Sequence, residues 1–226
     1  MTGILAVAAN GKVFMGSDSI YMDGWARDAT AQDKVFIRGN RFMFGCAGSP
    51  RMAQVLRYLV PFPREQHKGE SAEEYLVTVL IESVRSTMRE AGCLEIDNGV
   101  EGGAAFLLGY KGKVYAVHHG FQLHEPAQQV IALGAASDTL LASVLTQRVY
   151  HGGTFRDAEI EYQIKTAFVV AEQVSSAVVG PYRLDVLDEP TEVQSDGLVS
   201  GFPSLTDLAE FVDQELLRSE PNGKQQ

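Results

Sequence analysis

Cysteine is scarce in this sequence, which excludes several kinds of site. The 226 residues contain only Cys46 and Cys93, and neither lies at a metal-ligand spacing. A disulfide framework is therefore excluded, and two structural thiols are typical of a reducing compartment such as the cytoplasm. Of the five histidines, His118 and His119 are neighbours and would point to opposite faces of a strand. We expect no metal and no cofactor.

Basic residues and long apolar runs are also few. The chain has 19 Lys and Arg against 29 Asp and Glu, a formal net charge of −10, and the basic residues are scattered. This balance argues against a nucleic-acid partner and against an anionic membrane surface. No apolar run reaches the roughly 18 residues of a membrane helix, and the first residues lack the basic region and cleavage site of a signal peptide. We expect a cytoplasmic protein without membrane or nucleic-acid partners.

Strand-like runs and turn residues predict two hairpins in the first 48 residues. The apolar run 3–9 (GILAVAA) and the run 12–17 (KVFMGS) flank Asn10-Gly11, a two-residue hairpin signal. Residues 19–33 are polar and indicate a loop or a short irregular strand. The segment 34–48 has Gly39-Asn40 at its centre and is interpreted as the second hairpin.

The apolar period then changes to that of helices. Ser49 is a plausible N-cap and Pro50 suits the first helical position; an apolar stripe follows at Met52, Val55, Leu56, Leu59 and Val60. Ser71 and Glu74 have capping-box spacing, and a second helix is expected over 72–91, ended by Gly92.

The second half repeats this order. Strands are expected at 103–110 and 113–119 around Lys111-Gly112, and another at 130–135. A helix capped by Ser137 or Asp138 runs to about 148. The next begins near Asp157 with an apolar side of Ile160, Ile164, Ala167, Phe168, Ala171 and Val174, and a strand follows at 181–187.

Antiparallel hairpins and helix pairs in this order predict an α+β fold. Two sheets stacked face to face, with a helix pair on each outer side, would bury every apolar stripe, which is a four-layer α-β-β-α sandwich of two antiparallel sheets. We expect this domain over 1–190. Residues 191–226 would form a C-terminal extension with one amphipathic helix at 204–217, capped by Ser204, and a frayed tail.

Thr2 has the features of a catalytic N-terminus. If an aminopeptidase removes Met1, Thr2 carries both a hydroxyl and an α-amino group. The amine, with an ordinary pKa of about 8, can act as the base that the weakly nucleophilic hydroxyl needs. The small side chain of Thr2 permits removal of Met1, and Gly3 leaves room around the new terminus.

Such a nucleophile needs an ammonium to lower the hydroxyl pKa and a carboxylate to hold that ammonium. Asp18 ends the strand that pairs with the Thr2 strand, so it returns to the same edge of the sheet. Lys34 opens the next hairpin and can enter beside them. Gly48, at the strand-to-helix junction GCAGSP, would offer a backbone N–H to the oxyanion of a tetrahedral intermediate.

These residues resemble a known family. Thr at the mature N-terminus, Gly-Ser-Asp at 16–18, Lys-Val-Phe-Ile at 34–37 and Gly-x-Ala-Gly at 45–48 look like the proteasome β-subunits and bacterial HslV. These are N-terminal-nucleophile (Ntn) hydrolases, and the resemblance extends in order over about residues 2–187.

The resemblance implies a threonine peptidase with the Ntn hydrolase fold. Thr2 would be nucleophile and base, Lys34 would lower its hydroxyl pKa, Asp18 would orient Lys34, and the Gly48 N–H would bind the oxyanion. It also implies a homo-oligomeric ring that cleaves peptides or unfolded proteins. The chain has no P-loop, so any ATP-dependent unfoldase would be a separate protein.

Two departures from the family pattern leave alternatives open. Gly134-Ala135-Ala136 replaces Gly-Ser-Gly, with Ser137 only later, and SSAVVGP places Ser176 and Val179 where active subunits carry Asp and Ser. Ser137 and Ser176 are candidate substitutes in the network around the Thr2 amine. The alternatives are a catalytically silent proteasome-like scaffold subunit and an Ntn amidohydrolase for a small amide.

Overall fold

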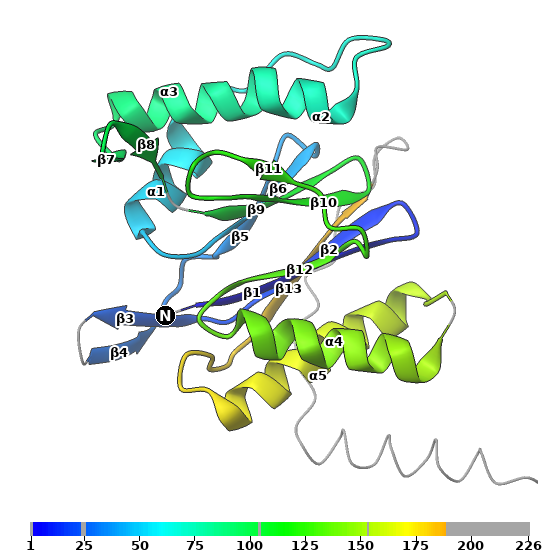
Figure 1. Cartoon of the computed structure of the whole chain (residues 1–226). Coiled ribbons are helices and arrows are strands. Elements are labelled where there is room, and N and C mark those ends of the chain that lie inside the picture. Colours follow the sequence, from blue (N-terminus) through cyan, green and yellow to red (C-terminus); the bar gives the residue numbers. More distant parts are fainter. Residues whose placement is uncertain (1, 24–25, 104, 153, 189–226) are drawn as a thin grey trace, which may run out of the picture.

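Two antiparallel sheets stack face to face between two layers of helices in the computed structural model, which describes residues 2–23, 26–103, 105–152 and 154–188 (Figure 1). The four-layer α-β-β-α sandwich expected from the sequence is therefore confirmed. The predicted extension at 191–226, including the helix at 204–217, lies outside the described residues. None of the helices within the described ranges combines the length and apolar character needed to cross a bilayer.

The first sheet contains the N-terminal hairpin at its centre. Its strands, all antiparallel, are in spatial order β12 (Val130–Gly134), β1 (Gly3–Ala9), β2 (Lys12–Ser17) and β13 (Arg183–Asp188). Asn10 and Gly11 both have positive φ, as the tight turn between β1 and β2 requires. The β1 sequence does not alternate in polarity, because Ile4 faces the other sheet, Leu5 faces the helices, and both faces are buried.

The second sheet is built from the later hairpins. Its strands are in spatial order β11 (Leu123–His124), β10 (Lys113–Val117), β9 (Phe106–Tyr110), β6 (Phe42–Cys46) and β5 (Val35–Arg38). The strands β9 and β10 are shorter than predicted. A core of aliphatic and methionine side chains, including Ile4, Met15, Met43 and Leu107, fills the space between the two sheets.

A helical layer covers the outer face of each sheet (Figure 1). The layer on the β5–β11 sheet consists of α1 (Pro50–Gln54), η1 (Val55–Leu59), α2 (Ala72–Tyr75), η2 (Leu76–Ile81) and α3 (Glu82–Glu90). The layer on the β1 sheet consists of α4 (Ser137–His151) and α5 (Asp157–Val174). Each layer has its own apolar core against its sheet.

The structure corrects the predicted helical faces at two positions. Leu59 is 49% exposed, although Met52, Val55, Leu56 and Val60 are buried. The reason is that η1 is π-helical, with the Val60 N–H bonded to the Val55 carbonyl at 3.1 Å, and the wider turn rotates Leu59 off the apolar face. Val174 is also exposed, because it is the last residue of α5.

The expected cap of α4 is wrong. The N-cap residue is Ala136, without a side-chain cap, and Ser137 is already the first helical residue. The Ala135 N–H bonds back to the Thr2 carbonyl at 2.8 Å, which closes the turn at Ala135 and lets the helix start at Ser137.

Two small hairpins also differ from the sequence interpretation. Within the segment 19–33, β3 (Ile20–Asp23) pairs with β4 (Ala26–Ala29), and this hairpin projects beside the N-terminus (Figure 1). Between α3 and β9, β7 (Glu95–Asp97) pairs with β8 (Val100–Gly102) around Asn98 and Gly99, both with positive φ.

Candidate active site

Thr2 directly precedes the central strand β1, and hydrogen bonds of its backbone hold it in place. The residue is 9% exposed, and its carbonyl accepts the hydrogen bond from the Ala135 N–H. The next residue, Gly3, pairs with Gly134 at the end of β12. The backbone of Thr2 is therefore fixed from the side of β12 and α4.

Two glycines permit this close packing. A Cβ on Gly134, whose φ is +99°, would lie 2.0 Å from the Thr2 carbonyl oxygen, so no other residue fits without moving the Thr2 backbone. A Cβ on Gly3 would lie 2.7 Å from a methyl group of Val178. The β12–α4 turn and the chain that follows α5 therefore both pack closely against the start of β1.

Asp18 follows β2 and is buried completely. One carboxylate oxygen accepts the Gly3 N–H at 2.7 Å and the other accepts the Ile20 N–H at 2.9 Å. Both oxygens also accept from the Lys34 ammonium, at 3.0 and 2.9 Å. Because the backbone bonds fix the carboxylate next to the start of β1, Asp18 sets the position of Lys34.

Lys34 connects the two sheets. Its carbonyl accepts the Cys46 N–H of β6 at 2.9 Å, which places its backbone in the β5–β11 sheet. Its ammonium reaches across to the β1 sheet and donates to the Thr2 hydroxyl oxygen at 3.2 Å in addition to its two bonds with Asp18. An ammonium has three N–H donors. In Lys34 one donor bonds to Thr2 and two bond to Asp18.

Burial lowers the pKa of Lys34 below its ordinary 10.5, and the adjacent Asp18 carboxylate opposes this shift. The Lys34 side chain is 13% exposed and that of Asp18 is 0% exposed. A charge in such surroundings acts strongly on its neighbours because little water screens it. The arrangement therefore places a positive charge against the Thr2 hydroxyl, where it favours the ionised oxygen.

Gly48 lies at the same end of the sandwich as Lys34. It follows β6 by two residues, after Cys46, and precedes Ser49, whose hydroxyl caps α1 by accepting the Met52 N–H at 3.4 Å. Gly48 is exposed and has a φ of +95°. This conformation turns the backbone sharply where the sequence predicted the oxyanion donor.

The two candidate serines differ in how they connect to Thr2. Ser137 is half-buried and lies two residues after Ala135, whose amide binds the Thr2 carbonyl. Ser176 is exposed in the segment after α5. Ser137 therefore lies next to the turn that holds Thr2, whereas Ser176 is exposed to solvent.

Sequence reasoning missed a third serine near the site. The Ser19 hydroxyl donates to the Pro181 carbonyl at 2.6 Å, and the Ser19 N–H to the Val179 carbonyl at 3.4 Å. These bonds tie the segment after α5 to the residue next to Asp18. The Gly-Ser-Asp-Ser sequence at 16–19 contained the signal, but Pro181 lies 162 residues farther along the chain, so no local pattern could identify it as the partner.

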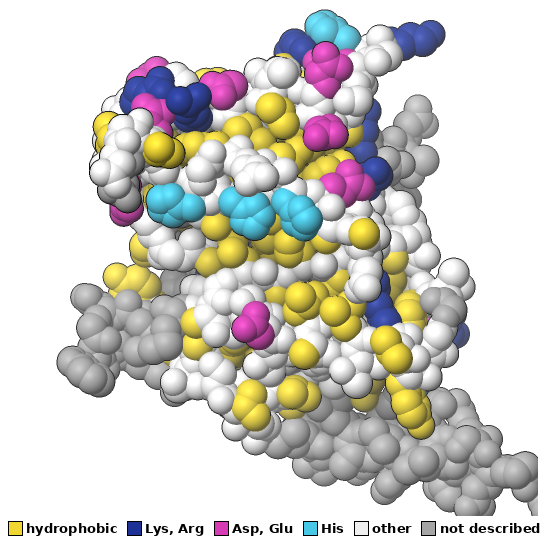
Figure 2. All heavy atoms as spheres, in the orientation of Figure 1, with side chains coloured by type: hydrophobic (Ala, Val, Ile, Leu, Met, Phe, Trp, Pro, Cys, Tyr) yellow, Lys and Arg dark blue, Asp and Glu magenta, His cyan; other side chains and the backbone are white. Residues whose placement is uncertain are grey.

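The histidines do not belong to this site. Several histidine side chains form a row on the face of the sandwich shown in Figure 2. The ring centroids of His118 and His124 are 5.9 Å apart. Within the described residues, no group of three or more His, Cys, Asp or Glu side chains is arranged to hold a metal ion.

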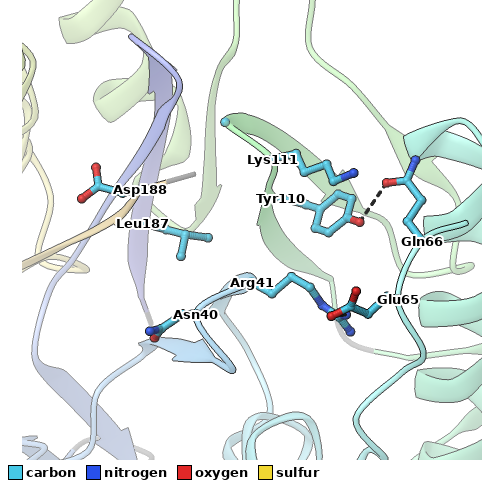
Figure 3. A pocket seen from close by; sticks show the side chains of 9 residues that line it. Asn40, Arg41, Glu65, Gln66, Tyr110, Lys111, Leu187 and Asp188 are labelled. Atoms are coloured by element: carbon cyan, nitrogen blue, oxygen red, sulfur yellow. Dashed lines mark hydrogen bonds and ion pairs between the residues drawn. The ribbon is translucent and has the colours of Figure 1, made fainter. Parts of the chain in front are cut away.

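A cavity lies at the opposite end of the sandwich, where Tyr110 donates to Gln66 at 2.9 Å (Figure 3). Its wall includes Leu187 and Asp188, which pair with the far end of β2. The seven residues of β1 separate this end from Thr2 by about 20 Å, at roughly 3.3 Å per residue.

Solved structures share this fold at low sequence identity. The chain is similar to Thiobacillus denitrificans BPH in complex with epoxomicin (TM-score 0.66, 14% identity, 84% of this chain and 100% of that chain covered). It is similar to HslV from Trypanosoma brucei (TM-score 0.58, 15% identity, 83% and 100% covered) and to the helical assembly of the Anbu complex from Pseudomonas aeruginosa (TM-score 0.62, 15% identity, 99% and 98% covered).

No protein-family model matches the chain, and no curated protein matches it in sequence. The structural likeness, at these identities, shows a proteasome-like fold.

Proposed function

We propose that this chain with a proteasome-like fold is a threonine-type endopeptidase in which Thr2, freed by removal of Met1, attacks peptide bonds. The observation that carries the proposal is the Lys34 ammonium, which donates at 3.2 Å to the Thr2 hydroxyl while its two other bonds go to Asp18. A buried ion pair costs desolvation energy. A fold that needed only stability would gain as much from apolar side chains at 18 and 34.

The first half of the reaction would form an ester. The Thr2 α-amine accepts the hydroxyl proton as the oxygen attacks the peptide carbonyl, and the Lys34 charge stabilises the oxygen as it becomes ionised. The exposed Gly48 N–H would donate to the oxyanion of the tetrahedral intermediate. When the intermediate collapses, the C–N bond breaks and the leaving amine takes the proton held by the Thr2 amine.

The second half would release the product. Water attacks the ester carbonyl with the Thr2 amine as base, the carbon–oxygen bond to Thr2 breaks, and the hydroxyl recovers its proton. Asp18 keeps Lys34 charged and in place through both halves, because its carboxylate opposes the fall of the Lys34 pKa. Ser137 and Ser176 would assist the amine through water or after rearrangement on substrate binding.

We also propose a homo-oligomer in the cytoplasm that takes peptide or unfolded-protein substrates, fed by a separate ATP-dependent unfoldase. The support is the family resemblance of the sequence, together with the assembly in which the Pseudomonas aeruginosa Anbu structure was solved. Large apolar side chains on the helical layers, among them Tyr58, Val149 and Tyr150, are 70% or more exposed and suit burial between copies.

Two departures favour a second candidate, a catalytically silent scaffold of the same fold. Ala135 lies at the turn beside Thr2, and Val179 binds the Ser19 N–H through its carbonyl. Neither residue has a side-chain hydroxyl that could support the amine. An amidohydrolase for a small amide is the third candidate, since it would use the same Thr2 chemistry without an enclosed chamber.

Turnover of a fluorogenic peptide by purified variants tests the proposal. Thr2→Ala should abolish turnover, whereas Thr2→Ser, which keeps a hydroxyl and an amine, should retain part of it. Lys34→Ala should lower kcat by about 100-fold or more, because it removes the charge against the ionising oxygen. Hydrolysis that survives Thr2→Ala would exclude the mechanism. Turnover of small amides but not of peptides would favour the third candidate.

A further inference from the structure

We propose that Asp33 is a positioning residue, which fixes the reach of Lys34 through an ion pair with Arg183. The inference rests on the proposed function, because it concerns the same ammonium. Asp33 immediately precedes Lys34, and it takes no part in the bond-making and bond-breaking steps described above.

The first contact of Asp33 crosses to the other sheet. Arg183 begins β13 in the β1 sheet and pairs in register with Ser17, the residue before Asp18. Its guanidinium forms an ion pair with the Asp33 carboxylate, and a second nitrogen donates to the Ala31 carbonyl at 3.5 Å. The segment leading into Lys34 is therefore bound to the sheet that carries Thr2 and Asp18.

The second contact comes from the helical layer above. Arg57 of η1 donates to the Asp33 carbonyl, and its guanidinium lies 4.4 Å from the ring centroid of Phe36. Phe36 stacks on Phe44 with centroids 5.4 Å apart, within the β5–β11 sheet. Asp33 is thus held from both sides, by Arg57 at the carbonyl and by Arg183 at the carboxylate.

The geometry of Lys34 makes these contacts matter. Its carbonyl bonds to Cys46 of the β5–β11 sheet, whereas its ammonium bonds to Thr2 and Asp18 at the end of the β1 sheet. The Asp33–Arg183 pair joins the same two sheets, because Asp33 directly precedes Lys34 and Arg183 belongs to β13 of the β1 sheet. A displacement of about 1 Å at a reacting group costs about 100-fold in rate, so loosening the pair should be visible in kcat.

The solvent exposure of the Asp33–Arg183 pair distinguishes a positioning role from a contribution to overall stability. The side chains of Arg183 and Asp33 are 41% and 44% exposed, and an ion pair so open to water contributes little to the free energy of unfolding. The Lys113–Glu125 pair, at 2.8 Å and with exposures of 52% and 38%, is a matched control far from the site. Loss of either pair should change the unfolding temperature equally little.

The test compares kcat, KM and the thermal midpoint of Asp33→Asn, Arg183→Gln, Arg183→Lys and the control Lys113→Gln. We expect Asp33→Asn and Arg183→Gln to lower kcat by about 10- to 100-fold with KM within about twofold. Arg183→Lys, which keeps the ion pair, should retain most of kcat, and every midpoint should match that of Lys113→Gln. A wild-type kcat in both Asp33→Asn and Arg183→Gln, or an equal loss in Arg183→Lys, would overturn the proposal.

A second readout does not depend on catalysis. The rate at which acetic anhydride acetylates Lys34, followed by peptide mass mapping, should rise several-fold in Asp33→Asn and stay unchanged in Lys113→Gln, because the released ammonium becomes more accessible. An unchanged rate in Asp33→Asn would contradict the role of Asp33 even if the wild type proved inactive. Absence of wild-type turnover alone would instead count against the proposed function.

Discussion

At the scale of single residues, the reactivity of Thr2 depends on the balance of charges between Asp18 and Lys34. Asp18 satisfies two backbone N–H groups and the ammonium together, so both oxygens of its carboxylate have partners. Burial pushes the Lys34 pKa down and Asp18 pushes it back up. The Asp18 carboxylate therefore helps to hold the positive charge that Lys34 places against Thr2.

Asp18→Asn should shift the pH dependence of Thr2 reactivity. Loss of the carboxylate removes the group that raises the Lys34 pKa, so the alkaline fall in acylation rate should move to lower pH. The variant should also lose about 3 kcal/mol of unfolding free energy near neutral pH, since a buried charge is left without its partner. This penalty applies below the folded-state pKa of Lys34 and should disappear as the pH approaches 10.5, where the unfolded chain also loses the proton.

Urea unfolding from about pH 6 to the ordinary lysine pKa of 10.5 measures this penalty. The double variant Asp18→Asn/Lys34→Met, which removes both charges, should recover most of the lost stability and none of the activity. A penalty independent of pH would show that the pair does not carry a buried charge.

At the scale of elements, the turn between β12 and α4 shapes the site. The backbone of Gly134 and Ala135 packs against Thr2, and α4 starts directly after this turn with Ala136 as its N-cap residue. The β1–β2 hairpin forms the other side of the site. Its strand pairing places Asp18 next to Gly3, the first residue of β1, whose N–H bonds to the Asp18 carboxylate.

Gly134→Ala should damage this turn far more than Gly152→Ala. Both glycines have positive φ, but a Cβ at 134 meets the Thr2 carbonyl and a Cβ at 152 has no atom within 4 Å. We expect about 1 kcal/mol of destabilisation for Gly152→Ala, from backbone strain, and about 3 kcal/mol or more for Gly134→Ala, from strain plus the clash. Urea midpoints compare them, and equal losses would show that the close approach is unimportant.

Much of the fold was predictable from local patterns. The Asn10-Gly11 turn predicts the β1–β2 hairpin, and the pairing of its strands returns Asp18 to the Thr2 end of the sheet. The π-helical turn that exposes Leu59 has no such signal, since the residues fit an ordinary helical period equally well. The Asp33–Arg183 pair depends on two distant segments meeting across the sheets, which no local pattern records.

At the scale of the whole molecule, the sandwich leaves apolar side chains exposed on its helical layers. Tyr58 and Tyr150 are 70% and 85% exposed, and the proposed assembly would bury such side chains between copies. Light scattering on the purified protein should give a molar mass several times that of one chain, stable on dilution. A single-chain mass at micromolar concentration would contradict the proposed assembly.

The central claim is that Thr2, with a free amine, is the nucleophile. Its most direct test is the intact mass of the purified protein before and after treatment with a peptide epoxyketone, which bonds to a hydroxyl and an amine on the same residue. We predict a chain that lacks Met1 and gains one inhibitor mass, located on Thr2 by peptide mapping and absent in Thr2→Ala. A chain that retains Met1, or a free Thr2 that takes no inhibitor, would contradict this claim.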